Sequence, residues 1–458
     1  MTLVPLSPRY PLTPRFDQSA LALAAAIRDG TLRSAELVEH CLSRVLAFDG
    51  TLSAFVEVLA ETARREAEQA DKDRARGKLR GPFHGVPTAI KDQHLIRFTR
   101  TQFGSRATLG GLWSPVDDQI VRRIRAGGFV ILGKTTMPDY GLLPITEPDL
   151  HPPTRNPWNP AYTAGGSSGG AGAALASGMV PVAPGSDGAG SIRIPSALNG
   201  LIGLKPTRGV VPDDTARWDR DGLVTVGPMG RCVEDVATLL DVLTPEGRGH
   251  YAERARHDPP KLRIGVVREA PFGELDRRLV TAVDEVAARL TDAGHTVVER
   301  PCPAGTVDEF IPIYQRLFAN LPILAPGRLT RTVRWMRDQG RSNDVTHVNR
   351  QLGRFIAAGA DAMAGLDIML TPTLATLAPK VGAFQHLEPR EQFQAVSPLG
   401  AFTALANLTG QPAISVPWGS VHGLPIGVQL LGHAHADGTL LALARRILAD
   451  NVAMRAAS

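Results

Sequence analysis

Short apolar runs alternate with amphipathic stretches along the chain, and this alternation predicts strands covered by helices. Apolar residues recur at helical spacing from Leu37 to Leu46, behind Ser34 as the expected N-cap. The heavily charged stretch 55–76 predicts a second helix. Residues 116–126 are again helical in pattern and lead into an apolar strand at 129–132. The first third of the chain therefore predicts a mixed α/β protein.

The second half continues this pattern after a stretch rich in Gly, Arg, His and Pro at 245–260. A strand, a helix and a strand are expected at 262–267, 278–290 and 296–299, an arrangement typical of a βαβ unit. Residues 305–363 are mainly helical in pattern. The remaining expected elements are a helix at 233–243, strands at 367–372, 413–417 and 427–430, and a helix at 440–448.

Two loops that combine glycine with serine stand out between these elements, at Gly165–Gly170 and Gly185–Ser191. Such clusters are often flexible linkers, but these two flank apolar residues at 171–175 and 179–183, which predict a buried helix and strand. Glycines let the backbone approach a ligand with its N–H groups turned inward, beside a serine hydroxyl. This combination favours acyl transfer.

Composition narrows the class of protein. The chain has 458 residues, 43% of them hydrophobic, and a formal net charge of +5 without a long basic run, so no nucleic-acid partner is expected. Its three cysteines lie far apart, which predicts neither a disulfide framework nor a metal site. The apolar patch 21–27 is too short to span a bilayer. We expect a cytoplasmic enzyme that binds no membrane and needs no cofactor.

One competing motif is that of a nucleotide-binding loop. Residues Gly128–Thr135 match G-x-x-x-x-G-K-[ST], including Lys134. That motif needs a flexible loop to wrap phosphate, whereas 129–132 is an apolar strand in pattern, and Pro138 falls where the following helix should begin. These two features disfavour an NTPase, although the motif matches.

A second competing motif is G-x-S-x-G, which Gly166–Gly170 satisfies with Ser168 as the nucleophile of an α/β-hydrolase. The nucleophile of that fold follows a buried strand, but residues 151–163 are rich in Pro and Asn and show no strand pattern. The histidine that this alternative requires has downstream candidates in His422, His433 and His435. An esterase using Ser168 thus stays open as a less favoured alternative.

Four linked motifs, taken together, resemble the amidase signature family. They are G-V-P-x-x-x-K-D, G-G-S-S-G-G, D-x-x-G-S-[I/V]-R-x-P and G-L-K-P-T, which lie here at Gly85–Asp92, Gly165–Gly170, Asp187–Pro195 and Gly203–Thr207. The resemblance extends weakly over the flanks. It implies one large domain at 1–458 with a mixed, mostly parallel sheet covered by helices on both faces. The catalytic core would be at about 81–243, and 245–260 would be a surface excursion.

The resemblance also implies the roles of particular residues. Ser191 would be the nucleophile, Ser167 a bridging serine whose own peptide bond is cis, and Lys91 the base. The lysine must be neutral to accept a proton, which requires burial in an apolar site, and its neighbours Ala89 and Ile90 are apolar. The implied oxyanion-hole amides are those of Gly188, Ala189, Gly190 and Ser191, and the implied supporting residues are Ser168, Asp187 and Arg193.

One position departs from the family. Ala189 stands where relatives mostly have glycine, so this loop carries an extra Cβ. If the position required a positive φ, the alanine would be strained by about 1 kcal/mol or more.

The expected activity is hydrolysis of a linear small-molecule amide by a stand-alone amidase. The alternative within the resemblance is the glutamine-hydrolysing A subunit of a tRNA-dependent amidotransferase, but residues 208–218 depart from the stretch typical of that subunit. We expect substrate choice to depend on segments outside the motifs, including 310–336 and 384–402. The sequence leaves open which amide is cleaved, whether esters react and whether the chain forms a homodimer.

Overall fold

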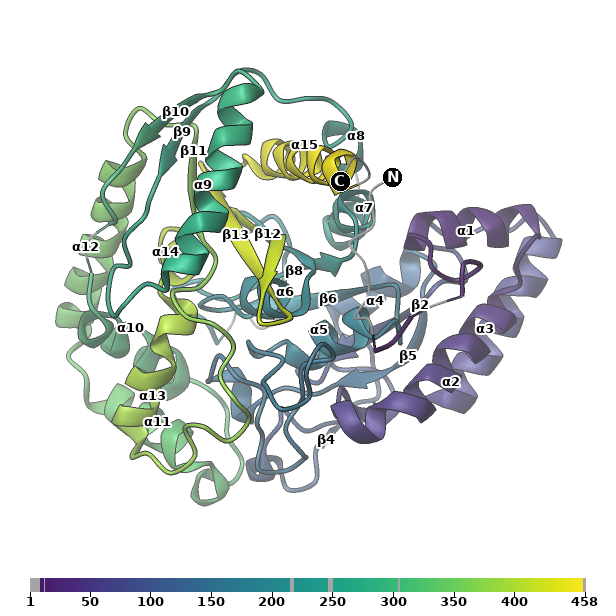
Figure 1. Ribbon diagram of the computed structural model, residues 1–458. Coiled ribbons are helices and arrows are strands. Elements are labelled where there is room, and N and C mark those ends of the chain that lie inside the picture. The colour runs from purple at the N-terminus through teal and green to yellow at the C-terminus, as the bar shows by residue number, and fades with distance from the viewer. Residues whose placement is uncertain (1–8, 12, 215–217, 246–249, 304, 456–458) are drawn as a thin grey trace.

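A large sheet forms the centre of the molecule, as the computed structural model shows for residues 9–11, 13–214, 218–245, 250–303 and 305–455 (Figure 1). Its eight strands have the order β10-β9-β11-β13-β12-β7-β8-β6. Their bounds are β6 (Val182–Asp187), β7 (Ile202–Lys205), β8 (Thr225–Gly230), β9 (Arg263–Val266), β10 (Thr296–Glu299), β11 (Ile368–Pro372), β12 (Ala413–Val421) and β13 (Leu424–Gly432). Strands from the end of the chain therefore lie in the middle of the sheet.

The sheet is mixed, which confirms the expected α/β class. Strand β9 pairs in parallel with both β10 and β11, as a βαβ unit requires. The other five neighbouring pairs are antiparallel. Parallel pairing thus dominates at only one edge, in contrast to the expectation for the whole sheet. For the central pair the reason is local: β12 and β13 are joined by two residues, and so short a connection can join only antiparallel strands.

A second sheet continues from the β6 edge. It has the order β1-β5-β2, with β1 at Phe55–Val58, β5 at Val130–Thr135 and β2 at Pro87–Lys91. The Thr88 hydroxyl of β2 donates 2.8 Å to the Val182 carbonyl of β6, so the two edges lie side by side. Lys91 at the end of β2 consequently lies beside the end of β6. A short pair, β3 (Arg100–Thr101) with β4 (Leu112–Trp113), lies outside both sheets.

Helices cover both faces, and the alternation of side chains along β13 separates the two layers. Val428 and Leu430 pack into the main core with α7 (Val233–Leu243), α9 (Arg277–Asp292) and α15 (Asp437–Arg455). The intervening Gln429 instead accepts a hydrogen bond from Arg193 of α6 (Arg193–Asn199). Because successive strand residues point to opposite faces, α6 lies across the sheet from α7, α9 and α15.

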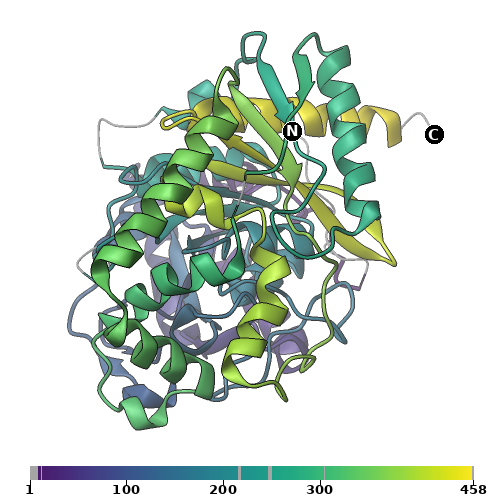
Figure 2. The same ribbon diagram turned by 90° about the vertical axis from the view of Figure 1, so that its left-hand side faces the viewer.

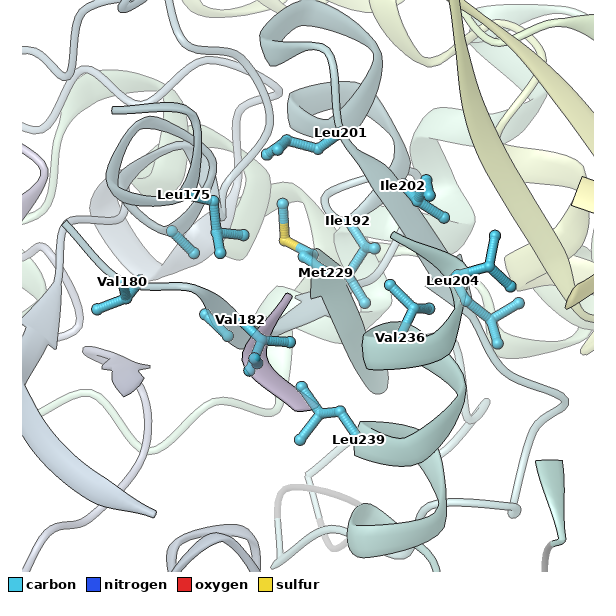
Figure 3. Packing of buried hydrophobic residues seen from close by; sticks show 14 of the residues in the cluster. Leu175, Val180, Val182, Ile192, Leu201, Ile202, Leu204, Met229, Val236 and Leu239 are labelled. Carbon is cyan, nitrogen blue, oxygen red and sulfur yellow. The ribbon is translucent and has the colours of Figure 1, made fainter. Parts of the chain in front are cut away.

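The core around the glycine loops is closely packed (Figure 3). Leu175 of α5 (Gly169–Ala176), Val182 of β6, Ile202 of β7 and Met229 of β8 are all at most 1% exposed. Leu239 of α7 lies in the same cluster. The glycine loops are therefore anchored in the interior at both ends, which a linker would not be.

The N-terminal helices α1 (Ala20–Asp29), α2 (Ser34–Leu52) and α3 (Ala60–Ala75) form a purple layer at one edge of Figure 1. Two details differ from expectation. Ser34 is the first helical residue rather than the N-cap, and its hydroxyl donates 2.7 Å to the Gly85 carbonyl. Residues 55–58 form β1 instead of helix, because they pair with β5.

The predicted helical region 305–363 is confirmed. It contains α10 (Val307–Ala319), α11 (Arg331–Ser342) and α12 (Val345–Met363), the green helices in front of the teal core in Figure 2. The other helices are α4 (Gln119–Ala126), α8 (Tyr251–Arg254), α13 (Pro389–Val396) and α14 (Ala404–Thr409).

Most of the described residues in the segment 245–260, the predicted surface excursion, are exposed. Residues 246–249 lie outside the described residues. Tyr251 of α8 is only 8% exposed and belongs to the main core. Within the described ranges, the helices are all too short or too polar to cross a bilayer.

Candidate active site

Lys91 lies at the point where β2 meets β6 and is 1% exposed. Its Nζ donates to Ser167 Oγ at 2.8 Å and to Ser186 Oγ at 2.7 Å. Burial lowers the pKa of Lys91 to about 7, although the negative charge of Asp187 acts in the opposite direction. A substantial fraction of this amine is therefore uncharged near neutral pH.

The loop that carries Ser167 is shaped by two glycines. Gly165 and Gly166 have φ values of 75° and 61°, a region that favours glycine. A Cβ on Gly166 would lie 2.4 Å from Pro195 Cδ, so the loop approaches α6 as closely as a backbone can. The Ser167 N–H then donates to Ser191 Oγ at 3.0 Å. The three residues that the resemblance singled out are thus brought together.

The contact between the two serines runs through the backbone. Ser191 Oγ accepts the Ser167 N–H, which leaves the proton of Ser191 available for transfer. The resemblance implied a cis peptide bond at Ser167, but every peptide bond in the described ranges is trans. Trans is the conformation favoured for a bond that does not precede proline.

The Ser191 loop joins the end of β6 to the start of α6, and Asp187 holds it in shape. The Asp187 carboxylate accepts the N–H of Gly190 at 2.6 Å and of Ile192 at 3.2 Å. It also pairs with Arg193, and both side chains are fully buried. Burial disfavours the charged carboxylate, but the charge and hydrogen bonds of Arg193 outweigh it and lower the pKa of Asp187 to about 2. Asp187 and Arg193 therefore bond and brace this loop.

The amides of this loop are not equivalent. The Gly190 N–H is engaged by Asp187, whereas those of Gly188, Ala189 and Ser191 have no hydrogen-bond partner among the described residues. Gly190 has φ 129°, while Ala189 is not among the residues with positive φ. The extra Cβ of Ala189 is therefore accommodated without backbone strain.

The two competing motifs are both accounted for by the fold. Residues Val130–Thr135 form the buried strand β5, and Lys134 Nζ pairs with Asp92 Oδ1 at 2.7 Å. No phosphate-wrapping loop exists there. Ser168 Oγ bonds the backbone carbonyl and N–H of Ser186, at 3.1 and 3.2 Å, and is fully buried. Ser168 therefore braces the site from within and does not present a nucleophile.

Sequence reasoning missed three polar groups at the site. The Ser186 hydroxyl accepts from Lys91 and donates 2.7 Å to Gln93 Oε1, so these residues hold the lysine from the side opposite Ser167. Asn407 of α14 donates to the Asp187 carboxylate at 3.0 Å. Ser186 and Gln93 could have been suspected because they adjoin the motifs. Asn407 lies 220 residues from Asp187 and gave no signal.

A cavity of about 90 Å³ opens at Ser191 and Ala189. The described residues that line it include no Asp, Glu, Lys or Arg. Both segments expected to influence substrate choice contribute, the first with Phe310 and the second with Phe393 and Phe402. Ser191 therefore faces an uncharged, largely apolar space.

Comparisons with known proteins place the chain in a family. Residues 36–321 and 328–441 match the family model described as Amidase. A Mycobacterium bovis protein named "Putative amidase AmiB2" is 38% identical over 451 residues, which cover 93% of this chain and 95% of that protein. The 6-aminohexanoate-cyclic-dimer hydrolase of Paenarthrobacter ureafaciens is 33% identical over 480 residues, which cover 94% of each chain.

Solved structures are similar over the same length. A structure of 6-aminohexanoate cyclic dimer hydrolase matches with a TM-score of 0.85 and 31% identity, covering 95% of this chain and 97% of the other. A bacterial aryl acylamidase matches with a TM-score of 0.84 at 24% identity, covering 94% and 95% respectively, which supports the fold.

Proposed function

Because this chain belongs to the amidase signature family of amidohydrolases, we propose that it cleaves a carboxamide C–N bond through an acyl-enzyme on Ser191. The observation that carries the proposal is the pair of short contacts at Ser167. Its Oγ lies 2.8 Å from Lys91 Nζ and its N–H 3.0 Å from Ser191 Oγ. These contacts bring Ser191 and Lys91 to the same residue, and they support the proposal that the Ser167 hydroxyl relays the proton between them.

In the first step, Ser191 Oγ attacks the carbonyl carbon as its proton passes through the Ser167 hydroxyl to neutral Lys91. The carbonyl oxygen becomes an oxyanion, which the free amides of Gly188, Ala189 and Ser191 stabilise. When the C–N bond breaks, the leaving nitrogen takes the proton back from Lys91 through Ser167. An ester of Ser191 and a free amine result.

In the second step, water attacks this ester, and the same relay removes its proton. Collapse of the second tetrahedral intermediate returns the proton to Ser191 Oγ and releases a carboxylic acid. Burial supports this cycle because it lowers the pKa of Lys91 to about 7 and so lets the amine both accept and return a proton.

We infer that the natural substrate is a small linear amide, although a relative carries the name of a cyclic-dimer hydrolase. Activity should be compared on linear amides and anilides, the corresponding esters, 6-aminohexanoate cyclic dimer and glutamine, with product analysis. Turnover of the cyclic dimer alone would contradict the linear assignment. Glutamine hydrolysis only with partner proteins would favour the amidotransferase subunit.

The mechanism predicts that Ser191→Ala abolishes hydrolysis of an activated anilide while the far-UV circular dichroism spectrum stays that of wild type. Ser167→Ala should lose most activity as well, because Lys91 would lose its link to the nucleophile. Ser168→Ala tests the competing motif, since that hydroxyl bonds only the Ser186 backbone among the described residues. Retained turnover in Ser191→Ala, with loss in Ser168→Ala, would overturn the assignment of the nucleophile.

A further inference from the structure

Tyr314 of α10 lines the cavity beside the nucleophile loop and is 5% exposed. Its ring is fixed by three aromatic neighbours. The ring centroids of Phe310, Phe318 and Phe393 lie 5.3, 5.4 and 6.1 Å from that of Tyr314. Because packed rings have few rotamers, the position of the Tyr314 hydroxyl is fixed as well.

That hydroxyl lies against the predicted oxyanion loop. A Cβ built on Gly188 would be 3.4 Å from Tyr314 Oη, in ordinary van der Waals contact. Gly188 also carries one of the three amides that lack a partner among the described residues. The hydroxyl therefore lies beside the residue that precedes Ala189, and Ala189, Ser191 and Tyr314 all line the cavity.

Tyr314 differs from the other polar groups on this wall. Gln429 is engaged with Arg193, Thr371 and the Phe402 carbonyl, and Ser397 donates to the Phe393 carbonyl. No hydrogen bond of the Tyr314 hydroxyl is found in the part of the chain that the structure describes. Burial raises the pKa of Tyr314, so the phenol stays protonated and can donate.

The rest of the wall restricts what can bind. Transfer of a charged group into an apolar site without a counter-charge is costly, and no described lining residue could supply one. Five phenylalanines line the cavity, at positions 272, 310, 355, 393 and 402. Apolar carbon therefore suits this space, and a carboxylate or ammonium does not.

We propose that this cavity takes the uncharged, largely apolar acyl group of the substrate, and that the Tyr314 hydroxyl donates a hydrogen bond to the scissile carbonyl oxygen beside Gly188. The proposal rests on the function proposed above, since it places the carbonyl at Ser191. It assigns to α10 a donor that none of the four sequence motifs contains.

The first test is Tyr314→Phe, which keeps the ring and removes only the hydroxyl. We expect kcat/KM for a neutral anilide to fall roughly 10²-fold, in the range seen when one oxyanion donor is lost, with an unchanged melting temperature. Tyr251→Phe, a buried tyrosine of α8, is the matched control and should retain wild-type kcat/KM. An unchanged kcat/KM in Tyr314→Phe would overturn the role of this hydroxyl.

A second readout separates donation from a merely structural effect. Hexanal adds reversibly to a serine hydroxyl, and its oxygen then occupies the oxyanion position. Calorimetric affinity for hexanal should fall in Tyr314→Phe by a factor similar to that in kcat/KM. Equal affinity in wild type and variant would contradict hydrogen bonding to the reacting oxygen.

The acyl preference is tested on wild type with three p-nitroanilides of similar length, whose acyl groups are hexanoyl, succinyl and 6-aminohexanoyl. We expect hexanoyl to exceed both charged analogues by at least roughly 10²-fold in kcat/KM, and equal values would overturn the preference. If wild type cleaves none of them, the proposed function fails. The affinities for hexanal and for the charged succinic semialdehyde then still test whether the cavity prefers an uncharged group.

Discussion

At the scale of single residues, the chemistry of this site depends on a lysine that the fold keeps largely uncharged. Lys91 is surrounded by hydroxyls, with Ser167 and Ser186 both in contact with Nζ and no carboxylate bonded to it among the described residues. The nearby carboxylate of Asp187 is instead neutralised by Arg193. The Asp187 carboxylate could hold Lys91 protonated, but it is paired with Arg193. Burial therefore determines the protonation state of the Lys91 amine.

This arrangement predicts the pH dependence of activity. Burial lowers the pKa of Lys91 to about 7, and only the neutral amine can accept the proton of Ser191. The competent fraction is therefore small well below pH 7 and approaches one above it, so kcat/KM should rise through about pH 7 and then level off. Initial rates on a neutral anilide from pH 5 to 9 measure this. Constant kcat/KM down to pH 5 would show that Lys91 is not the base.

At the scale of elements, a side chain of helix α7 caps the start of helix α1. Helix α1 begins at Ala20, and the Asp235 carboxylate of α7 accepts the N–H groups of Ala20 and Leu21 at 2.7 and 3.0 Å. The first N–H groups of a helix have no partner within the helix, and a carboxylate there both bonds them and suits the helix dipole. One buried side chain thus attaches the N-terminal layer to the main core.

Removing this cap should loosen the attachment. Asp235→Ala leaves one buried and one partly buried N–H group without its partner, and we expect the free energy of unfolding to fall by about 1–3 kcal/mol. Urea denaturation followed by circular dichroism gives the value. Glu234→Ala, at the neighbouring position, is the control and should change stability by no more than about 0.5 kcal/mol. Equal stability of the two variants would contradict the capping role.

At the scale of the whole molecule, the nucleophile loop is held by the far end of the chain. Arg193 donates to Asp187, to Asn407 Oδ1 at 2.7 Å and to Gln429 Oε1 at 2.7 Å. Asn407 in turn donates to Asp187. The centre of the sheet is likewise formed by β12 and β13 packed against β7. The catalytic motifs and the last fifth of the chain are therefore parts of one folding unit.

A variant of Arg193 tests this connection. Arg193→Ala would leave Asp187 charged, buried and without its ion-pair partner, which costs about 3–5 kcal/mol. We expect a loss of stability of that size in urea denaturation, together with loss of activity. In Asp187→Asn/Arg193→Met the total loss should be smaller than the sum of the single losses, because the pair interacts directly. Additive effects would show that the two side chains do not form a coupled pair.

Much of the secondary structure was predictable where the hydrophobic residues recur with the period of a single helix or strand. The helix Val233–Leu243 and the strand Thr296–Glu299 have the predicted bounds, because each shows a clear local pattern. The prediction of helix at 55–58 was wrong, because the charged residues that follow continue a helical pattern. The short strand there forms only by pairing with β5. The prediction of Ser34 as an N-cap was also wrong, because its hydroxyl donates to the distant Gly85 carbonyl and does not cap its own helix.

The candidate site divides in the same way. Lys91, Ser167 and Ser191 were predicted from motifs, since tight glycine loops leave local traces in sequence. Their neighbours Asn407 and Tyr314 could not be predicted, because they reach the site from helices far along the chain. The absence of charge among the described residues of the cavity wall could not be predicted either. That wall is assembled from segments as distant as Leu142 and Leu431.

By itself, the sequence determined the family, the α/β class and the candidate residues for the chemistry, because loop geometry and hydrophobic periodicity are local properties. Only the tertiary structure decided the order and direction of the strands, the partners that hold Asp187 and Lys91, and the uncharged cavity at Ser191. These depend on contacts between residues far apart in the chain, such as Arg193 and Gln429, which are separated by 236 positions. Such contacts form through packing and burial, for which the chain has no local pattern.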